Sequence, residues 1–321
     1  MVPRVRTAFV LGAGLGTRLR PLTNVIPKPL LPIFGKRLVT FALDHLIASG
    51  VEQFVINTHH LSEQFADFFS DGSYRSKKIA LIYEPNLLET GGGILNAAAL
   101  FGPEPFLVYS GDILTDIDLG ALTDFHFQSG SMVTLALRHT GLSTDLSFDA
   151  TTNRVLDIRG QLGSGLPGSV DFANVSVWNP EMLRKIPAGR KISFVPVLAE
   201  AIRDHDQISG VVLDDHQWFN IGSREEYLGI HRTIVTSRWR PSYLTEANWP
   251  TTIADSAVVS EGVDIAGACW IGPESRIEPG TYLRDVIIWP HSTVRSGAHL
   301  SECVVAGVEV GPGTFCRTDF V

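Results

Sequence analysis

The chain has few cysteines, no excess of basic residues and no long hydrophobic segment. Its three cysteines, Cys269, Cys303 and Cys316, include no CxxC pair, so neither a metal site nor a redox role is expected of them. Lys and Arg number 26 against 34 Asp and Glu, a net charge of −8, which argues against a nucleic-acid or anionic-lipid surface. Apolar runs such as residues 94–101 are far shorter than the ~20 residues of a membrane span. The N-terminus has no signal-peptide pattern. We therefore expect a cytoplasmic protein with no membrane and no nucleic-acid partner.

The first part of the chain alternates apolar, β-rich runs with segments of helical periodicity. Strands are expected at residues 7–11, 54–57, 79–83, 105–110, 132–137, 147–148, 155–158 and 173–178, and helices at 38–49, 63–69, 92–100, 195–204 and 227–236. Such alternation is typical of a mostly parallel sheet with helices on both faces. The sequence therefore predicts an α/β fold with a Rossmann-like sheet. The glycine-rich stretch 160–168 predicts a mobile loop near a ligand.

The last part of the chain has a different pattern, in which an aliphatic residue recurs every six positions. Six-residue periodicity is typical of a parallel β-helix, in which each hexad forms one face of a triangular coil. This stretch resembles the left-handed hexapeptide-repeat β-helix, and its length predicts about three coils. We expect the sheet domain at residues 1–237, a linker at 238–251 and the β-helix at 252–321. The aliphatic series is Ile253, Val259, Ile265, Ile271, Ile277 and Leu283, followed after a slip of one residue by Ile288, Val294 and Leu300.

The strongest motif follows the first predicted strand. It reads Leu-Gly-Ala-Gly-Leu-Gly-Thr-Arg over residues 11–18, and Pro-Lys-Pro follows at 27–29. Glycines let the backbone approach a phosphate chain, and successive N–H groups form an anion-binding nest. Arg18 and Lys28 add two cations that neutralise charge on phosphate oxygens. The loop lacks the Gly-Lys-Ser/Thr of a Walker motif, and Leu19 stands where a Rossmann fingerprint has glycine.

Residues 12–23, together with Pro-Lys-Pro at 27–29, resemble the opening of the sugar-1-phosphate nucleotidylyltransferases. With the β-helical tail, the resemblance covers nearly the whole chain. It implies an enzyme that joins a nucleoside triphosphate to a sugar 1-phosphate and releases pyrophosphate, with a divalent metal, usually Mg²⁺. It also implies that Arg18 grips the leaving pyrophosphate and that Lys28 contacts the reacting phosphate. The residues that match the family's nucleotide cradle are Leu11, Gly12, Ala13, Gly14, Gly16 and Thr17.

A second segment that carries the resemblance begins at Glu84 and reads Glu-Pro-Asn-Leu-Leu-Glu-Thr-Gly-Gly-Gly. It is similar to the family's base-recognition segment, which implies that Glu84 and Gly91 bind the nucleotide. A carboxylate accepts hydrogen bonds only, which suits uracil N3–H or guanine N1–H and N2–H. GTP or UTP is therefore expected, and the choice between them stays open. The alternative interpretation of Glu84 is a surface glutamate before a proline turn.

The remaining implied residues concern the metal and the sugar. Asp112 follows the predicted strand 105–110 and matches the family's Gly-Asp pair, and a hard oxygen ligand at this edge of a sheet suits Mg²⁺. The second metal ligand of the family is an aspartate, which here is Asn220, a neutral donor. Asn174 matches a sugar-hydroxyl contact, with a structural strand-end asparagine as the alternative. The family's Glu-Lys-Pro is replaced by Gly-Gln-Leu at 160–162.

Three functions are compatible with these residues. The first is a nucleotidyltransferase that forms an NDP-sugar by in-line displacement, with a possible homo-oligomer through the β-helix. The second is a catalytically silent regulatory or sensor homologue, which Asn220 and the missing Glu-Lys-Pro favour mildly. The third is a β-helical acyltransferase using His291 or His299, although about three coils without a long inserted loop are short for that activity.

Overall fold

The computed structural model describes residues 4–321 of the 321-residue chain. The chain divides into two compact units. The sheet unit contains the residues up to Gly14 and the segment from Ala42 to Trp218, and the β-helix unit contains Leu15 to Phe41 and Phe219 to Val321. The proposed domain boundary at 238–251 stays a prediction. None of the helices within residues 4–321 is long and apolar enough to cross a membrane.

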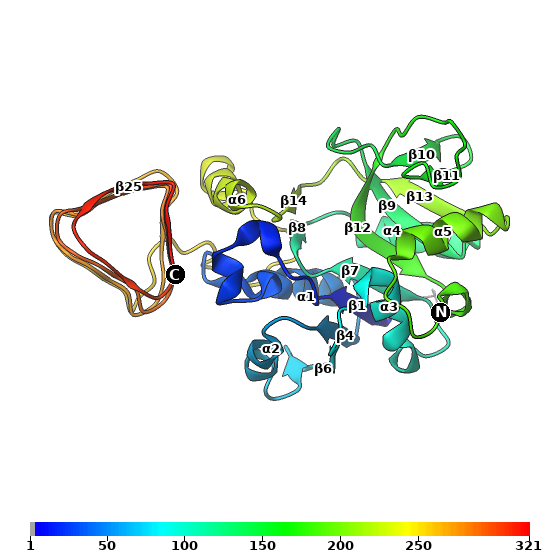
Figure 1. Ribbon diagram of the computed structural model, residues 1–321, viewed down its shortest axis with the longest axis horizontal. Coiled ribbons are helices and arrows are strands. Elements are labelled where there is room, and N and C mark those ends of the chain that lie inside the picture. Colours follow the sequence, from blue (N-terminus) through cyan, green and yellow to red (C-terminus); the bar gives the residue numbers. More distant parts are fainter. Residues whose placement is uncertain (1–3) are drawn as a thin grey trace. The chain divides into compact units, whose positions relative to one another are not determined.

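The sheet unit is built on ten strands in the order β10-β11-β13-β9-β12-β7-β1-β4-β6-β5 (Figure 1). Their bounds are β1 (Thr7–Leu11), β4 (Gln53–Thr58), β5 (Ser73–Tyr74), β6 (Lys77–Tyr83), β7 (Phe106–Ser110), β9 (Val133–Arg138), β10 (Leu146–Asp149), β11 (Arg154–Ile158), β12 (Asp171–Trp178) and β13 (Ile208–Val212). Two further strands are short, β8 (Ile113–Thr115) and β14 (Trp218–Asn220).

Strand direction divides this sheet into two parts. β1 pairs in parallel with β4 and β7, and β4 pairs in parallel with β6, so the parallel arrangement predicted for the first four strands is confirmed. β12 instead runs antiparallel to both β7 and β9. The fold is therefore α/β with a mixed sheet.

Six α-helices lie within residues 4–321, and five of them were predicted to within a few residues. The unpredicted helix is α4, which begins after Asp118, whose Oδ1 accepts a hydrogen bond from the Ala121 N–H (2.9 Å), and ends at Gly130 with φ of 66°. Aspartate N-caps and left-handed glycine C-caps are standard helix signals, so the sequence did contain the signals for both ends of α4. The helices are α1 (Leu38–Ala48), α2 (Ser62–Phe68), α3 (Glu89–Asn96), α4 (Leu119–Ser129), α5 (Phe194–Arg203) and α6 (Arg224–Ser237).

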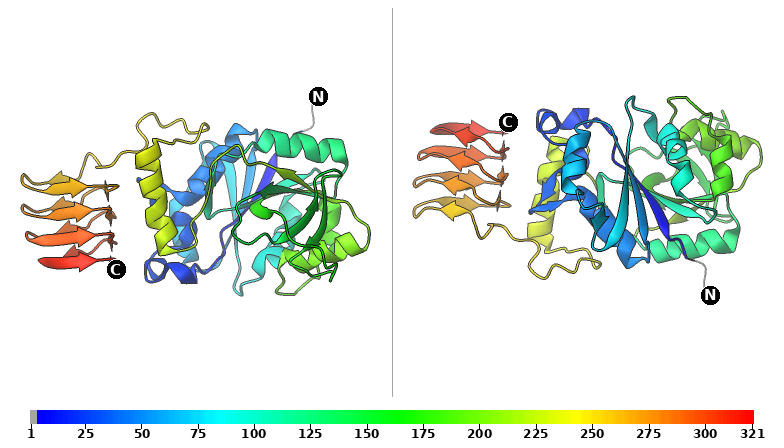
Figure 2. Two further views of the ribbon diagram at one scale, coloured as in Figure 1. Left: turned by 90° about the horizontal axis from the view of Figure 1, so that it is seen from above. Right: turned by 90° about the horizontal axis from the view of Figure 1, so that it is seen from below.

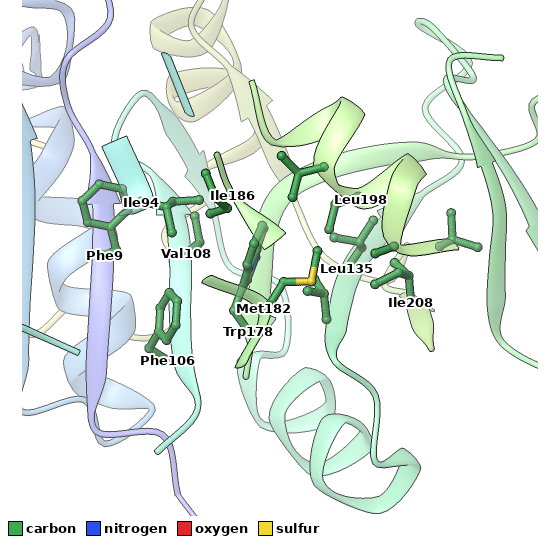
Figure 3. Packing of buried hydrophobic residues seen from close by; sticks show 14 of the residues in the cluster. Phe9, Ile94, Phe106, Val108, Leu135, Trp178, Met182, Ile186, Leu198 and Ile208 are labelled. Atoms are coloured by element: carbon green, nitrogen blue, oxygen red, sulfur yellow. The ribbon is translucent and has the colours of Figure 1, made fainter. Parts of the chain in front are cut away.

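Helices pack on both faces of the sheet, as predicted. On one face, α3 and α5 contribute to a core that contains Phe9, Phe106 and Trp178 (Figure 3). The opposite face carries α1 and α4. His45 Nδ1 of α1 lies 3.1 Å from the hydroxyl of Tyr109 on β7, and His126 Nδ1 of α4 lies 2.9 Å from the hydroxyl of Thr134 on β9. Successive residues of a strand point to opposite faces. The helices therefore fix the strands from both sides and leave the strand ends to the loops.

The C-terminal part of the β-helix unit is a triangular coil seen end-on in Figure 1 and as stacked layers in Figure 2. Each of its three faces has four parallel strands, which fit a left-handed β-helix with one more layer than the three coils predicted. The faces are β15 (Val258–Val259), β18 (Arg276–Ile277), β21 (Thr293–Val294) and β24 (Glu309–Val310); β16 (Asp264–Ala266), β19 (Tyr282–Arg284), β22 (Ala298–Ser301) and β25 (Gly313–Cys316); and β17 (Trp270–Ile271), β20 (Ile287–Ile288), β23 (Val304–Val305) and β26 (Asp319–Phe320).

The register of these strands explains the slip in the repeat. Val259 pairs with Ile277, and Ile277 pairs with Val294, which is closer in sequence by one residue. The coil therefore shortens by one residue while the aliphatic side chains stay stacked inside. The shorter period continues beyond Leu300 through Val305 and Val310, which are also buried in this core, and that continuation supplies the additional layer.

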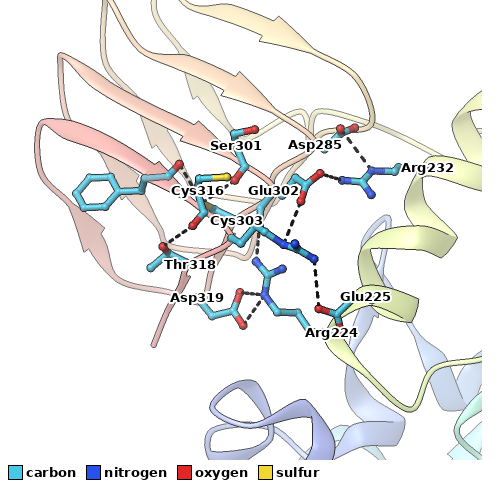
Figure 4. Close-up of polar contacts among 12 residues, drawn as sticks. Arg224, Glu225, Arg232, Asp285, Ser301, Glu302, Cys303, Cys316, Thr318 and Asp319 are labelled. Atoms are coloured by element: carbon cyan, nitrogen blue, oxygen red, sulfur yellow. Dashed lines mark hydrogen bonds and ion pairs between the residues drawn. The ribbon is translucent and has the colours of Figure 1, made fainter.

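One face of the β-helix is covered within its own unit. The outward-facing Trp270, Ile287 and Val304 are 2%, 0% and 0% exposed. From α6, Arg224 Nε pairs with both carboxylate oxygens of Asp319 (2.8 and 3.0 Å), and Arg232 lies 2.9 Å from Glu302 (Figure 4). The β-helix and α6 are therefore joined by buried apolar surface and by charged pairs at its margin.

Residues 15–41 belong to the same unit and are joined to it by a chain of hydrogen bonds. Two short strands, β2 (Pro32–Ile33) and β3 (Lys36–Arg37), form a hairpin. The Tyr227 hydroxyl on α6 donates to the Pro32 carbonyl (2.8 Å) and accepts from the Trp289 indole N–H (3.2 Å). Trp249 donates to the Ile33 carbonyl (3.1 Å). The hairpin that follows Lys28 is thus held by α6 and the β-helix.

Candidate active site

The loop after β1 is anchored by a series of two buried hydrogen bonds that links it to Asn57 and Glu84. The Gly12 N–H donates to Asn57 Oδ1 (2.8 Å), and Asn57 Nδ2 donates to Glu84 Oε1 (2.7 Å). Asn57 is the next-to-last residue of β4 and is 2% exposed. A Cβ on Gly12 would lie 2.7 Å from the Asn57 carbonyl oxygen, so a larger residue could not approach β4 so closely. Gly12 therefore fixes where the loop leaves the sheet.

Glu84 lies beneath this loop and is fully buried. Its second carboxylate oxygen accepts from the Leu88 N–H (2.9 Å), so both oxygens are used within the protein. Gly93 makes room for this arrangement, because a Cβ there would lie 2.8 Å from both Asn57 Nδ2 and Glu84 Oε1. This geometry gives Glu84 a structural part in supporting the loop and differs from the surface glutamate of the alternative interpretation.

Above this support lies a cavity of about 360 Å³ at the carboxyl ends of the parallel strands. Predicted residues that line it are Leu11, Ala13, Gly14 and Asp112. A Cβ on Gly14 would meet no atom within 4 Å, so the loop backbone borders open space here. Ligands of open α/β sheets bind at this edge, and a bare backbone beside a cavity lets N–H groups reach an anion. Gly91, in contrast, is buried against the backbone of residues 192–194.

A second cavity, of about 190 Å³, adjoins the first, since Leu11, Thr90, Ser110 and Ser193 line both. Asn174 lines this smaller cavity. Its φ is 61°, and it lies where the register of β12 with β9 shifts between Phe172 and Ser176. Asparagine tolerates the left-handed region better than most residues, and a bulge re-aims side chains. The bulge therefore explains why Asn174 lies beside the cavity.

The far wall of the smaller cavity carries one charged pair. Arg159 Nε lies 2.9 Å from Asp145 Oδ2, and both residues line the cavity. The nearby 160–168 loop, predicted as mobile, is tied back by Asp157, which accepts from the Leu162 and Ser164 N–H groups. Burial opposes ionisation of Asp157, but these bonds together lower its pKa.

A second carboxylate fixes the loop before β10. Asp171 accepts hydrogen bonds from the side chains of Thr140 and Ser143 and from the backbone of Ser143 and Thr144. Burial raises the pKa of Asp171, but these hydrogen bonds outweigh it and lower that pKa to about 2. The walls of the smaller cavity are therefore held by ionised carboxylates bonded to backbone.

The predicted basic residues lie in the β-helix unit. Gly16 has φ of 60°, and a Cβ there would lie 2.9 Å from Thr23 and 3.3 Å from Lys28. Lys28 is 7% exposed, whereas Thr17 and Arg18 are exposed. Left-handed backbone and close packing therefore require glycine at position 16.

Arg18 lies beside Asn220 in this unit. A Cβ on Gly222 would lie 2.7 Å from Arg18 Nη2 and 2.9 Å from Asn220 Nδ2. Asn220 Nδ2 is 3.5 Å from Glu226 Oε1, and the Gly222 N–H donates to Glu226 Oε2 (2.8 Å). Asn220 thus places an uncharged amide beside the Arg18 guanidinium, where an aspartate would add a negative charge.

Sequence reasoning missed several residues of the cavities. Thr90, Ser110 and Ser193 form the shared wall, and nothing in their spacing marks them, because they converge only in the fold. Asn57 had a usable signal, since it is a polar residue that ends a predicted apolar strand. Glu89 also lines the larger cavity; its φ of 61° costs about 1 kcal/mol for a residue with a side chain.

Comparison with known proteins identifies the family of this chain. The nucleotidyl transferase family model matches residues 7–146. The mannose-1-phosphate guanylyltransferase of Mycobacterium tuberculosis is 31% identical over 294 residues, which cover 90% of this chain and 81% of that protein. The N-acetylmuramate alpha-1-phosphate uridylyltransferase of Neisseria meningitidis is 36% identical over 226 residues, covering 67% of this chain and 93% of that protein. The chain belongs to the sugar-1-phosphate nucleotidyltransferases.

Solved structures share the fold of this nucleotidyltransferase at lower identity. HddC from Yersinia pseudotuberculosis superposes with a TM-score of 0.59 at 21% identity, over 70% of this chain and 97% of that chain. The inositol-1-phosphate CTP transferase from T. maritima gives a TM-score of 0.57 at 18% identity, over 70% and 92%. The fold of the enzyme is therefore shared with these two proteins.

Proposed function

We propose that this nucleotidyltransferase condenses a nucleoside triphosphate with a sugar 1-phosphate and releases pyrophosphate. The relatives named above act on nucleotides and sugar 1-phosphates, as their names state. In the proposed reaction a phosphate oxygen of the sugar 1-phosphate attacks the α-phosphorus of the triphosphate. A new phosphorus–oxygen bond forms, the bond to the β-phosphate oxygen breaks, and pyrophosphate leaves with that electron pair. No protein nucleophile is needed.

The observation that carries this proposal is the pair of adjoining cavities. A two-substrate transfer requires both substrates to meet, and the two cavities share a wall made of Leu11, Thr90, Ser110 and Ser193. We assign the larger cavity, bordered by Gly14, to the nucleotide and the smaller one to the sugar. Alignment of the two reacting groups in adjoining sites is a major source of rate.

In this proposal Arg18 and Lys28 supply the positive charge that such a reaction needs. We assign Arg18 to the leaving pyrophosphate and Lys28 to the reacting phosphate, while the backbone of Gly12, Gly14, Gly16 and Thr17 cradles the nucleotide. Cations fixed before the reaction stabilise charge that grows in the transition state. Arg18 is exposed and lies beside an uncharged Asn220. In the proposal its guanidinium pairs with phosphate oxygens. Asn174 is the proposed contact for a sugar hydroxyl.

The residues of the larger cavity fit a divalent cation. Asp112 is half-buried and lines the cavity, and it offers a hard oxygen donor. Within residues 4–321, no group of three His, Cys, Asp or Glu side chains could form a protein cage for a metal. Mg²⁺ is commonly bound by one or two carboxylates together with phosphates and water, so Asp112, with Asn220 as the second proposed donor, suits it. When bound, Mg²⁺ neutralises phosphate charge.

The test is pyrophosphate release from an array of the four nucleoside triphosphates against several sugar 1-phosphates, with and without Mg²⁺. Release that requires one nucleotide, one sugar phosphate and the metal supports the proposal. A catalytically silent homologue would bind nucleotide or NDP-sugar in calorimetry and release no pyrophosphate with any pair, and that result would exclude the enzyme. Acetyl-coenzyme A consumption is the matching assay for the acyltransferase alternative.

A further inference from the structure

The inner end of the smaller cavity is made of side chains from the hydrophobic core. One residue each from β9, β10, β11 and α5 lines it, and these residues are 1%, 2%, 4% and 0% exposed: Leu135, Leu146, Ile158 and Leu198. All four belong to one core cluster. Protein cores are close-packed and rarely leave a space larger than a water molecule. A cavity of about 190 Å³ that reaches into this core therefore favours an apolar occupant.

The wall that the smaller cavity shares with the larger one is polar. Thr90, Ser110 and Ser193 line both cavities and are half-buried. Thr90 Oγ1 accepts a hydrogen bond from the Phe194 N–H (3.0 Å). Ser193 Oγ accepts one from the Val195 N–H (3.2 Å). Each of these two hydroxyls keeps its own hydrogen to donate. The cavity thus changes from polar at its junction with the larger cavity to apolar at its inner end.

A plain hexose fits such a cavity poorly. Its ring carries hydroxyls on nearly every side, and a hydroxyl buried without a hydrogen-bond partner costs free energy. The rings of Phe172 and Phe194 also line the cavity, with their centroids 5.7 Å apart and their planes nearly perpendicular. Asn174, on the same strand as Phe172, supplies one amide. A hydroxyl turned toward the inner end would therefore lose its partner in water and gain none.

We propose that the sugar 1-phosphate carries an acylamino group, whose terminal methyl group occupies the inner end of the smaller cavity. The inference rests on the proposed function and names the substrate class of the same site. From the sugar ring outward, an acylamino group presents first a polar amide and then an apolar methyl group. This order matches the change from polar to apolar walls. A 6-deoxy sugar matches less well, because its methyl group brings no polar group to the polar wall.

The charges in the smaller cavity favour a neutral substituent. Its charged lining residues are Arg159 and Asp145, and Arg159 Nε lies 2.9 Å from Asp145 Oδ2. The two charges are of opposite sign and already paired. A free amino sugar would bring an ammonium group, and an ion moved from water to an apolar wall is strongly disfavoured. The acylated form of the amino group is therefore the one that this cavity suits.

The experiment compares sugar 1-phosphates in pairs that differ only in the acylamino group. The pairs are N-acetylglucosamine with glucose, N-acetylgalactosamine with galactose, and N-acetylmannosamine with mannose, all as 1-phosphates. We expect the acylamino member of at least one pair to have the higher kcat/KM for pyrophosphate release, by about 10–200-fold, the range for a small apolar group in a fitted pocket. Glucosamine 1-phosphate should be a poor substrate. Equal or higher values for the plain hexose in every pair would overturn the proposal, as would a preference for a 6-deoxyhexose 1-phosphate.

Leu146→Phe tests the inner end of the cavity directly, because the larger ring fills it. We expect this variant to lower kcat/KM for the acylamino sugar by at least about 10-fold and to leave the plain hexose unchanged. Leu100→Phe, at a leucine that is 45% exposed and outside the cavity, is the matched control and should change neither value. Equal losses for both sugars in Leu146→Phe would show that the substituent does not occupy the inner end.

A second measurement decides the matter if Leu146→Phe fails to fold, which thermal unfolding reports. Calorimetry on the wild type gives the heat-capacity change on binding each member of a pair. Burial of apolar surface makes this change more negative. We therefore expect a more negative value for the acylamino sugar than for the plain hexose. Equal values would refute the placement of the methyl group in the apolar inner end.

Failure of this inference is distinguishable from failure of the proposed function. If the wild type releases no pyrophosphate with any pair of substrates, the proposed reaction is wrong, and the sugar class is then read from equilibrium binding in the presence of the triphosphate. Tighter binding of an acylamino sugar 1-phosphate than of its plain partner supports the inference even then. Pyrophosphate release with plain hexose 1-phosphates alone would confirm the reaction and refute the inference.

Discussion

The buried chain from Gly12 through Asn57 to Glu84 should be the feature of the sheet unit most sensitive to a small change. In Asn57→Leu, the side-chain volume is nearly kept, but both hydrogen bonds of the amide are lost. These bonds are 2.8 and 2.7 Å long, and Asn57 and Glu84 are 2% and 0% exposed. The variant leaves the Gly12 N–H and one carboxylate oxygen buried without those partners.

The expected loss of stability follows from these two orphaned groups. A buried polar group left without its partner costs about 1–3 kcal/mol, and more when it is charged. Two such groups, offset slightly by the apolar leucine, give about 3–4 kcal/mol. For a unit of this size, 1 kcal/mol moves Tm by about 2–4 °C, so we expect Tm to fall by about 6–16 °C.

Calorimetry measures this fall, and hydrogen exchange of the peptide that contains Gly12 reports the local effect. The matched control is Asn96→Leu, at an exposed position of α3, which should change the free energy of unfolding by less than about 0.5 kcal/mol. A loss below about 1 kcal/mol for Asn57→Leu, or unchanged exchange at Gly12, would show that the buried chain does not hold the loop and would refute the reasoning.

Three other substitutions test the remaining features. Arg18→Ala should lower turnover at saturating substrates by roughly 10²-fold and leave Tm unchanged, because Arg18 is exposed; pyrophosphate release measures this, and near-normal turnover would remove Arg18 from the site. Tyr227→Phe deprives the Pro32 carbonyl and the Trp289 N–H of their hydrogen-bond partner and should destabilise the β-helix unit by about 2–4 kcal/mol. Thermal unfolding measures this loss, and an unchanged transition would show that these hydrogen bonds do not stabilise the unit. The pKa of Asp171 is lowered to about 2, so its stabilising effect is complete above the ordinary value near 3.9 and is lost as pH falls toward 2. Urea midpoints from pH 5 to 2 should therefore fall more steeply for the wild type than for Asp171→Asn, and parallel curves would argue against this assignment.

Much of the fold was predictable because its first half obeys local rules. Apolar runs ending in polar or glycine residues marked β1, β4, β6 and β7, and all of them lie within two residues of their predicted bounds. The direction of β12 was not predictable, because a strand's sequence does not state which neighbour it joins. The count of coils was too low because the shortened turns beyond Leu300 break the six-residue spacing.

The site was predictable where backbone geometry forces a residue type and much less where side chains converge from distant segments. Gly12 and Gly16 are required by close packing and by positive φ, and such positions leave a clear mark in the sequence. Asn174 depends on a bulge that no local pattern announces. The burial of Glu84 depends on Asn57, which lies on another strand, so a carboxylate expected at the ligand was found below the loop.

The grouping of residues 15–41 with residues 219–321 has a consequence during protein synthesis. Residues 15–41 are synthesised well before α6, Trp249 and Trp289, which provide one side of their packing. A nascent polypeptide that has not yet reached Trp289 lacks that support. Residues 15–41 should therefore reach their native packing only after synthesis has passed Trp289.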